Sequence, residues 1–130
     1  MYVTDTHPLV YAGLNALAKL GVHARQVFAK ARLGKGLVYV PTIALWEIAL
    51  LNKHNKLILP EPLDRWCRNL QGSRGFSIEP LDWMDVEEAR KLPFADPVDC
   101  LIVGTALRLQ LPLITKDQAI VESGLVEAVW

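Results

Sequence analysis

Short apolar runs alternate along the chain with longer segments in which apolar residues recur at the spacing of a helix. Short runs that are rich in Val, Ile, Leu and Tyr and bounded by Gly, Pro or Asp are typical of strands. Pro80 lies inside one such run, and because proline cannot donate to a sheet ladder, we expect that strand at an edge. The predicted strands cover residues 2–4, 36–40, 76–81, 111–115 and 126–130.

Helical segments separate these runs. We expect one helix to open at His7-Pro8 and another at Asp96-Pro97, because proline suits a first helical turn. The predicted helices begin near residue 7 and at residue 117 and span residues 21–33, 42–52, 63–70 and 96–110. Strands that alternate with helices in this way predict an α/β fold, with right-handed crossovers and a mostly parallel sheet covered on both faces.

The composition limits the class of protein. A chain of 130 residues that is 52% hydrophobic is long enough for one compact domain with a substantial core, so we expect a single domain over residues 1–130. The first residues have no signal-peptide pattern, and no run is long and apolar enough for a membrane span, which predicts a soluble, cytoplasmic protein without a membrane partner. Cys67 and Cys100 lack the spacing of a zinc site.

Charge is unevenly distributed although the formal net charge is zero. No acid lies between Asp5 and Glu47, whereas residues 76–99 hold seven acids against two bases. The bases of the acid-free interval are Lys19, Arg25, Lys30, Arg32 and Lys35. This predicts one basic and one acidic flank, which suits a substrate with a phosphate backbone but is equally typical of solvated helix faces.

Four carboxylates are isolated within strongly apolar stretches, namely Asp5, Glu47, Asp99 and Asp117. Because a carboxylate is costly to desolvate, such a residue usually finds a partner or holds a metal ion. Asp5 and Asp117 follow predicted strands, and the other two lie in helices that follow strands, so all four should meet at the carboxyl edge of the sheet. Oxygen-only ligands suit Mg²⁺ or Mn²⁺, and such sites commonly hydrolyse phosphodiesters.

Each acid also has a structural interpretation. Asp5 fits a strand-to-helix turn, and Asp117 fits a helix N-cap. Asp96 precedes Pro97 and therefore fits an N-cap as well as a place at the edge of a metal site, while Asp99 could interact with the helix dipole. The apolar surroundings of Glu47 argue against a merely exposed position.

In order along the chain, four segments resemble the PIN-domain family, in particular the VapC-type ribonuclease toxins of toxin–antitoxin pairs. The segments are VTDTHPLVY, ALWEIALL, DPVDCLIVGTAL and LPLITKDQAI. The resemblance implies a three-layer α/β/α fold with Asp5, Glu47, Asp99 and Asp117 as catalytic metal ligands and Asp96 beside them. It also implies cleavage of RNA (tRNA, rRNA or mRNA) with Mg²⁺ or Mn²⁺, a homodimer, and a small antitoxin that blocks the acidic pocket.

Two hydroxyl residues, Thr6 and Thr115, fall where the family often has such residues near the site, and with Lys116 they are candidates for substrate binding. The four tryptophans are candidates for core or interface anchors, with the core as the default: Trp46, Trp66, Trp83 and Trp130. We therefore expect a metal-dependent endoribonuclease. The alternative is a non-catalytic PIN-like module whose acidic pocket receives basic residues of a partner.

Overall fold

Five parallel strands form one sheet in the computed structural model, which describes residues 1–130. The strands are β1 (Tyr2–Thr4), β2 (Val38–Pro41), β3 (Phe76–Glu79), β4 (Leu113–Ile114) and β5 (Ala128–Val129). Their order is β3-β2-β1-β4-β5, so β1 lies at the centre. β3 lies at an edge, as Pro80 predicted. The parallel sheet of the sequence prediction is confirmed.

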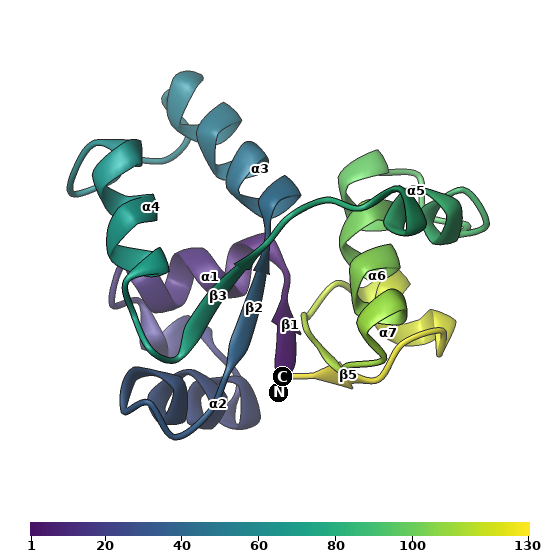
Figure 1. The fold of residues 1–130 in the computed structure, drawn as a ribbon, viewed down its shortest axis with the longest axis horizontal. Helices are drawn as coiled ribbons and strands as arrows, with labels where there is room; N and C mark the ends of the chain where they lie inside the picture. The colour runs from purple at the N-terminus through teal and green to yellow at the C-terminus, as the bar shows by residue number, and fades with distance from the viewer.

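Helices cover both faces of the sheet, which confirms the three-layer α/β/α fold (Figure 1). On one face lie α1 (Thr6–Gly13) and α2 (Val22–Arg32), and on the other lies α6 (Pro97–Leu109). Alternate side chains of a strand point to opposite faces. Ile114 therefore packs with Phe28 of α2, whereas its neighbour Leu113 packs with Ile102 of α6.

Two more helices complete the packing. The helix α4 (Leu63–Gln71) extends the layer that contains α1, whereas α3 (Thr42–Lys53) packs on both α1 and α6. Ile48 of α3 and Trp66 of α4 share a core cluster with Leu9, Val10 and Val40. The far end of α3 projects beyond the sheet (Figure 1), and only Ala44 and Ile48 of this helix are buried. The expectation that Trp46 lies in the core is therefore wrong, since 55% of its surface is exposed.

The remaining helices are short: η1 (Leu17–Lys19), α5 (Trp83–Ala89) and α7 (Gln118–Ser123). The sequence did not predict α5. Its N-terminus is fixed by a reciprocal capping box between Asp82 and Asp85. Trp83, which was expected in the core, is 75% exposed on this helix. None of the helices is long and apolar enough to cross a lipid bilayer.

A buried ionic cluster attaches α5 to the rest of the molecule. Asp85 is fully buried and accepts a short hydrogen bond from Nε of Arg108 in α6. The Nη2 atom of Arg108 donates to Oε1 of Glu79 over 2.8 Å, and Asp85 Oδ2 accepts from the backbone N–H of Asp82 over 2.9 Å. The guanidinium thus joins the end of β3 to two helices.

Replacing Arg108 with Ala should destabilise the fold by about 3 kcal/mol, because it leaves a buried carboxylate without its partner. Urea unfolding would measure this loss. The matched control is Arg90→Ala, which removes the exposed pair with Glu87 and should leave the unfolding midpoint nearly unchanged. Equal effects of the two substitutions would contradict a structural role for the cluster.

Candidate active site

The carboxyl ends of β1 and β4 lie side by side and place Asp5 next to Thr115. Thr4 pairs with Ile114, and the backbone N–H of Asp5 donates to Ile114 O over 3.0 Å. Asp5 is 7% exposed, and its carboxylate accepts hydrogen bonds from the Thr6 backbone N–H (2.8 Å) and from Thr115 Oγ1 (2.7 Å). Asp5 is therefore the N-cap of α1 and is also held toward β4.

Thr115 connects Asp5 to the second acid of this edge, Asp117. Its hydroxyl oxygen accepts a hydrogen bond from the Asp117 backbone N–H over 3.1 Å, and the same hydroxyl donates one to Asp5. The Asp117 carboxylate in turn accepts from the Ile120 backbone N–H over 3.1 Å and caps α7. One threonine thus fixes the relative positions of two carboxylates that are 112 positions apart in the sequence.

The other predicted acids face the same space from α3 and α6. Asp96 caps α6 through a 2.8 Å bond from the Val98 backbone N–H, with Pro97 in the first turn. A cavity of about 290 Å³ brings all of the predicted acids together; its lining is Asp5, His7, Pro8, Glu47, Asp96, Asp99, Lys116 and Asp117. Asp96 and Asp117 are helix N-caps, as one interpretation of the sequence expected, and Asp5 caps the helix that follows its strand-to-helix turn; all three also line the cavity.

Burial and repulsion between carboxylates raise the pKa values of two acids in the cavity, Asp99 and Asp5. Burial, followed by the charges of Asp5, Asp96, Asp117 and Glu47, raises the pKa of the Asp99 carboxyl to about 7. Burial also raises the pKa of Asp5, although the hydrogen bonds from Thr115 and Thr6 oppose that shift. A positive ion in the cavity would relieve this repulsion.

The five acids of the cavity fit a hard divalent cation in their chemistry, since their side chains offer carboxylate oxygens. No three His, Cys, Asp or Glu side chains are placed to hold one ion directly. Mg²⁺ usually keeps several waters and takes only one or two carboxylates from a protein. The arrangement therefore fits an ion that is bound in part through water.

The remaining sequence candidates take different positions. Thr6 and Thr115 are fully buried, and neither lines the cavity; the Thr6 hydroxyl has no hydrogen-bond partner. Lys116 is exposed and lines the cavity. His7, at which the sequence predicts the opening of a helix, lies in the first turn of α1, is exposed and lines the cavity.

The linking role of Thr115 was missed by the sequence analysis. The signal for it is modest: a hydroxyl residue two positions before an N-cap aspartate can accept a local hydrogen bond. Its bond to Asp5 depends on the pairing of β1 with β4, which the local sequence does not reveal.

Comparison with known proteins gave one family. The model of the PIN domain matches residues 2–123. No curated protein matched the chain.

Three solved structures share the fold over nearly the whole chain. A toxin–antitoxin complex from Klebsiella pneumoniae is 19% identical, with coverage of 100% of this chain and 97% of that chain and a TM-score of 0.62. VapBC2 from Rickettsia felis, bound to a DNA fragment of its promoter, is 14% identical, with coverage of 98% and 96% and a TM-score of 0.69. FitAcB from Neisseria gonorrhoeae is 18% identical, with coverage of 100% and 97% and a TM-score of 0.64. At these identities the likeness shows the fold.

The raised pKa of Asp99 makes a prediction about stability. Because the folded state holds the Asp99 proton more tightly than the unfolded chain, this group lowers stability as pH rises from about 4 to about 7. Asp99→Asn removes that loss, so in EDTA the variant should melt higher than wild type near pH 7, and the difference should shrink toward pH 4. Melting temperatures across this range would measure it.

The matched control is Asp64→Asn, which removes a carboxylate with 68% of its side chain exposed. That substitution should give no such trend with pH. A lower melting temperature of Asp99→Asn at neutral pH would show that the Asp99 charge does not oppose folding.

Proposed function

The chain belongs to the PIN domain family, and from that premise we propose that it is a divalent-metal-dependent endoribonuclease that hydrolyses RNA phosphodiester bonds. The observation that carries the proposal is the cavity in which Asp5, Glu47, Asp99 and Asp117 meet. The raised pKa of Asp99 supports it, because carboxylates gathered at such a cost are typical of functional sites.

We propose that these four carboxylates hold one or two Mg²⁺ or Mn²⁺ ions, with Asp96 at the exposed rim of the cavity. When bound, such an ion supplies activation of water and neutralises charge that develops on a phosphate. Asp99 must lose its proton to take part, so the site should fill more readily above about pH 7. Thr115 and the backbone of Thr6 keep both Asp5 oxygens fixed, which makes them positioning groups.

Lys116 is proposed to bind a substrate phosphate at the entrance of the cavity. It is exposed, it lines the acidic space, and no salt bridge of the structure includes it. An ammonium group in that situation is available to an anionic ligand.

Likeness in fold to chains of toxin–antitoxin complexes supports a more specific role. We propose that the chain is the toxin of a type II toxin–antitoxin pair and that a small antitoxin protein blocks the acidic cavity. The second candidate function is a non-catalytic module, in which basic side chains of a partner enter the cavity in place of a metal ion. The absence of a ready-made direct metal site is compatible with that alternative.

The decisive measurement is cleavage of a pool of tRNA and rRNA by the purified protein with Mn²⁺ and with EDTA. Asp5→Asn should lower the cleavage rate by at least about a hundredfold, because several kcal/mol of charge stabilisation depend on the bound cation. Asp64→Asn, the exposed control on α4, should cleave like wild type.

Intact RNA together with no rise in melting temperature on addition of Mn²⁺ would exclude the nuclease. That result would favour the non-catalytic module, because a protein whose folded state binds the ion must be stabilised by it.

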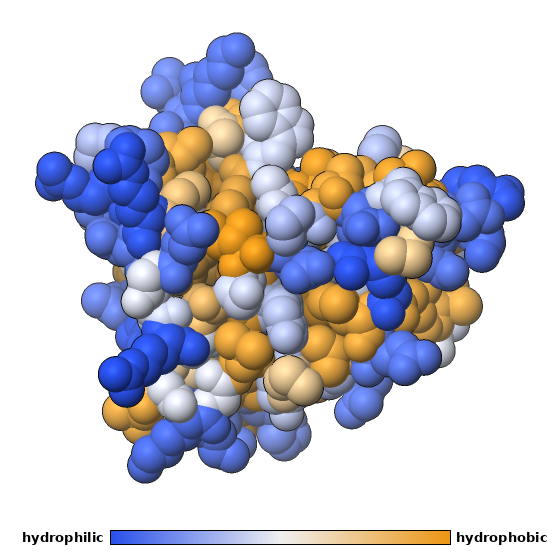
Figure 2. All heavy atoms as spheres, viewed as in Figure 1, coloured by the Kyte–Doolittle hydropathy of each residue, from blue (hydrophilic) through white to orange (hydrophobic).

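We also propose that the protein forms a homodimer, which exposed apolar side chains support. Trp83 (75% exposed), Met84 (41%) and Val86 (50%) lie on α5, and Trp46 (55%) lies on α3. Apolar surface, orange in Figure 2, lies between α3 and α5. Exposed apolar patches of this kind are typical of interfaces.

Trp83→Glu should convert a dimer to a monomer, because burying an unpaired carboxylate in an apolar interface is costly. Light scattering after size-exclusion chromatography would measure the mass. Lys53→Glu, an exposed change at the end of α3, is the control and should leave the mass unchanged. A wild-type monomer at all accessible concentrations would contradict the dimer.

A further inference from the structure

An aromatic pair holds Lys116 beside the acidic cavity. Its Nζ lies 5.2 Å from the ring centroid of Tyr11 and 5.5 Å from that of Trp130. These are cation–π distances, and they place the ammonium between two rings rather than in an ion pair with the neighbouring carboxylates. Lys116 therefore forms no salt bridge with the acids that line the cavity with it.

Tyr11 has a second lysine beside it. Nζ of Lys19 lies 5.4 Å from the Tyr11 ring centroid, and the His7 ring lies 6.3 Å away at an interplanar angle of 51°. Lys19 is exposed and, like Lys116, takes part in no salt bridge. Lys116, the Tyr11 ring and Lys19 thus form a surface that begins at the acidic cavity and extends beyond it.

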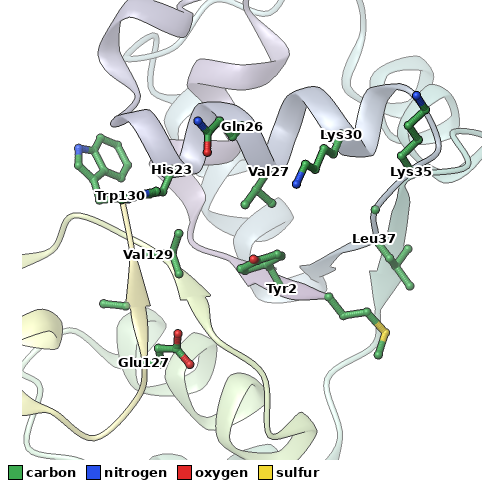
Figure 3. A pocket seen from close by; sticks show the side chains of 13 residues that line it. Tyr2, His23, Gln26, Val27, Lys30, Lys35, Leu37, Glu127, Val129 and Trp130 are labelled. Atoms are coloured by element: carbon green, nitrogen blue, oxygen red, sulfur yellow. The ribbon is translucent and has the colours of Figure 1, made fainter.

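A second cavity begins where this surface ends. It measures about 500 Å³, and Trp130 is part of its lining. In Figure 3, α2 forms one wall with His23 and Lys30, Lys35 follows at the end of that helix, and Glu127 lies on the opposite wall. Glu127 is the only acidic side chain in the lining, against the basic side chains of Lys30 and Lys35.

The position of Trp130 is fixed by the start of α2. Gly21 has no side chain, and a Cβ there would come within 2.5 Å of Trp130 Cδ1. The indole therefore lies against the helix at the junction between the two cavities, with Lys116 on its ring. A ring held in this way is a prearranged stacking surface.

We propose that Tyr11, Lys19, Lys116 and Trp130 form a track that carries a single-stranded RNA from the acidic cavity into the second cavity. In that cavity Lys30 and Lys35 contact phosphates, and Trp130 stacks on an unpaired base. The inference rests on the proposed nuclease function, because the track would guide the same RNA substrate on one side of the scissile bond.

Single-stranded RNA fits these groups better than a duplex or a protein. Aromatic rings stack on bases only where the bases are unpaired, and proteins that bind single strands combine such rings with a basic groove. Lysine binds phosphate as a point charge, and none of the four lysines takes part in a salt bridge. Lys116 lines the acidic cavity, whereas Lys19, Lys30 and Lys35 are not part of its lining, so the track leads a polyanion away from the carboxylates that repel it.

The test is the salt dependence of binding of a fluorescent, mixed-sequence, single-stranded oligoribonucleotide in EDTA, followed by anisotropy. Lys30→Ala with Lys35→Ala should reduce the slope of log Kobs against log salt by about 1.4, since each phosphate contact on a single strand contributes about 0.7. The control, Lys53→Ala with Lys56→Ala, removes the same charge from the exposed end of α3 and should leave the slope unchanged. Equal slopes for the two double variants would overturn the proposal, and the track would then be a surface for a protein partner.

Trp130 gives an independent readout. Trp130→Ala should weaken binding of the single strand by about fivefold to 150-fold, whereas binding of the annealed duplex should not change and Trp130→Phe should restore most of the affinity. Equal losses for single strand and duplex would overturn the stacking role.

Cleavage of the same oligonucleotide by wild type with Mn²⁺ is measured separately. If the lysine variants lose binding while no cleavage occurs, the track stands and the nuclease proposal fails. If cleavage occurs and the slopes are unchanged, the nuclease stands and the track fails.

Discussion

Repulsion between carboxylates gathered in one partly buried cavity is the constraint on which the rest of the structure depends. The parallel sheet creates this repulsion, because β1 and β4 pair side by side. Asp5 follows β1 and Asp117 follows β4, so the two carboxylates share one cavity. The fold also offsets the repulsion: Asp5, Asp96 and Asp117 each accept a backbone N–H at the start of a helix, where the dipole favours negative charge. Capping and a place in the cavity are thus two consequences of one geometry.

The fold could be predicted from sequence to the extent that its elements are locally encoded. Short apolar runs gave the strands, and Pro80 gave the edge position of β3. The helix α5 was missed although its capping box, Asp82 with Asp85, is local. The contacts of Arg108 with Asp85 and Glu79, which attach this helix to the fold, join residues 23 and 29 positions apart and cannot be read from the local sequence. Trp46 and Trp83 are exposed although the core was the default position for both, because hydrophobicity alone does not tell which apolar side chains are buried.

The acids of the site were predictable for a related reason. Their positions after strands and in first helical turns, together with the resemblance to the PIN family, determined which edge of the sheet they share. The groups that orient them were not predictable, since the bond between Thr115 and Asp5 requires the register of β1 with β4. Trp130 is similar: Thr115 N donates to Val129 O, and this pairing of β4 with β5 sets the indole beside Lys116.

Although the net charge of the chain is zero, it has an acidic surface and a basic surface, which meet at Lys116. An acidic cavity by itself repels a polyanion, and a bound divalent cation changes that only at short range because salt screens it within about 8 Å. In the proposed nuclease, by contrast, basic groups next to the cavity would act on the phosphates that flank the scissile one and would steer the approach of the strand. A lysine that paired with Asp5 or Asp99 would be lost to both tasks. Holding Lys116 on aromatic rings keeps its charge available while the carboxylates stay free for a metal ion.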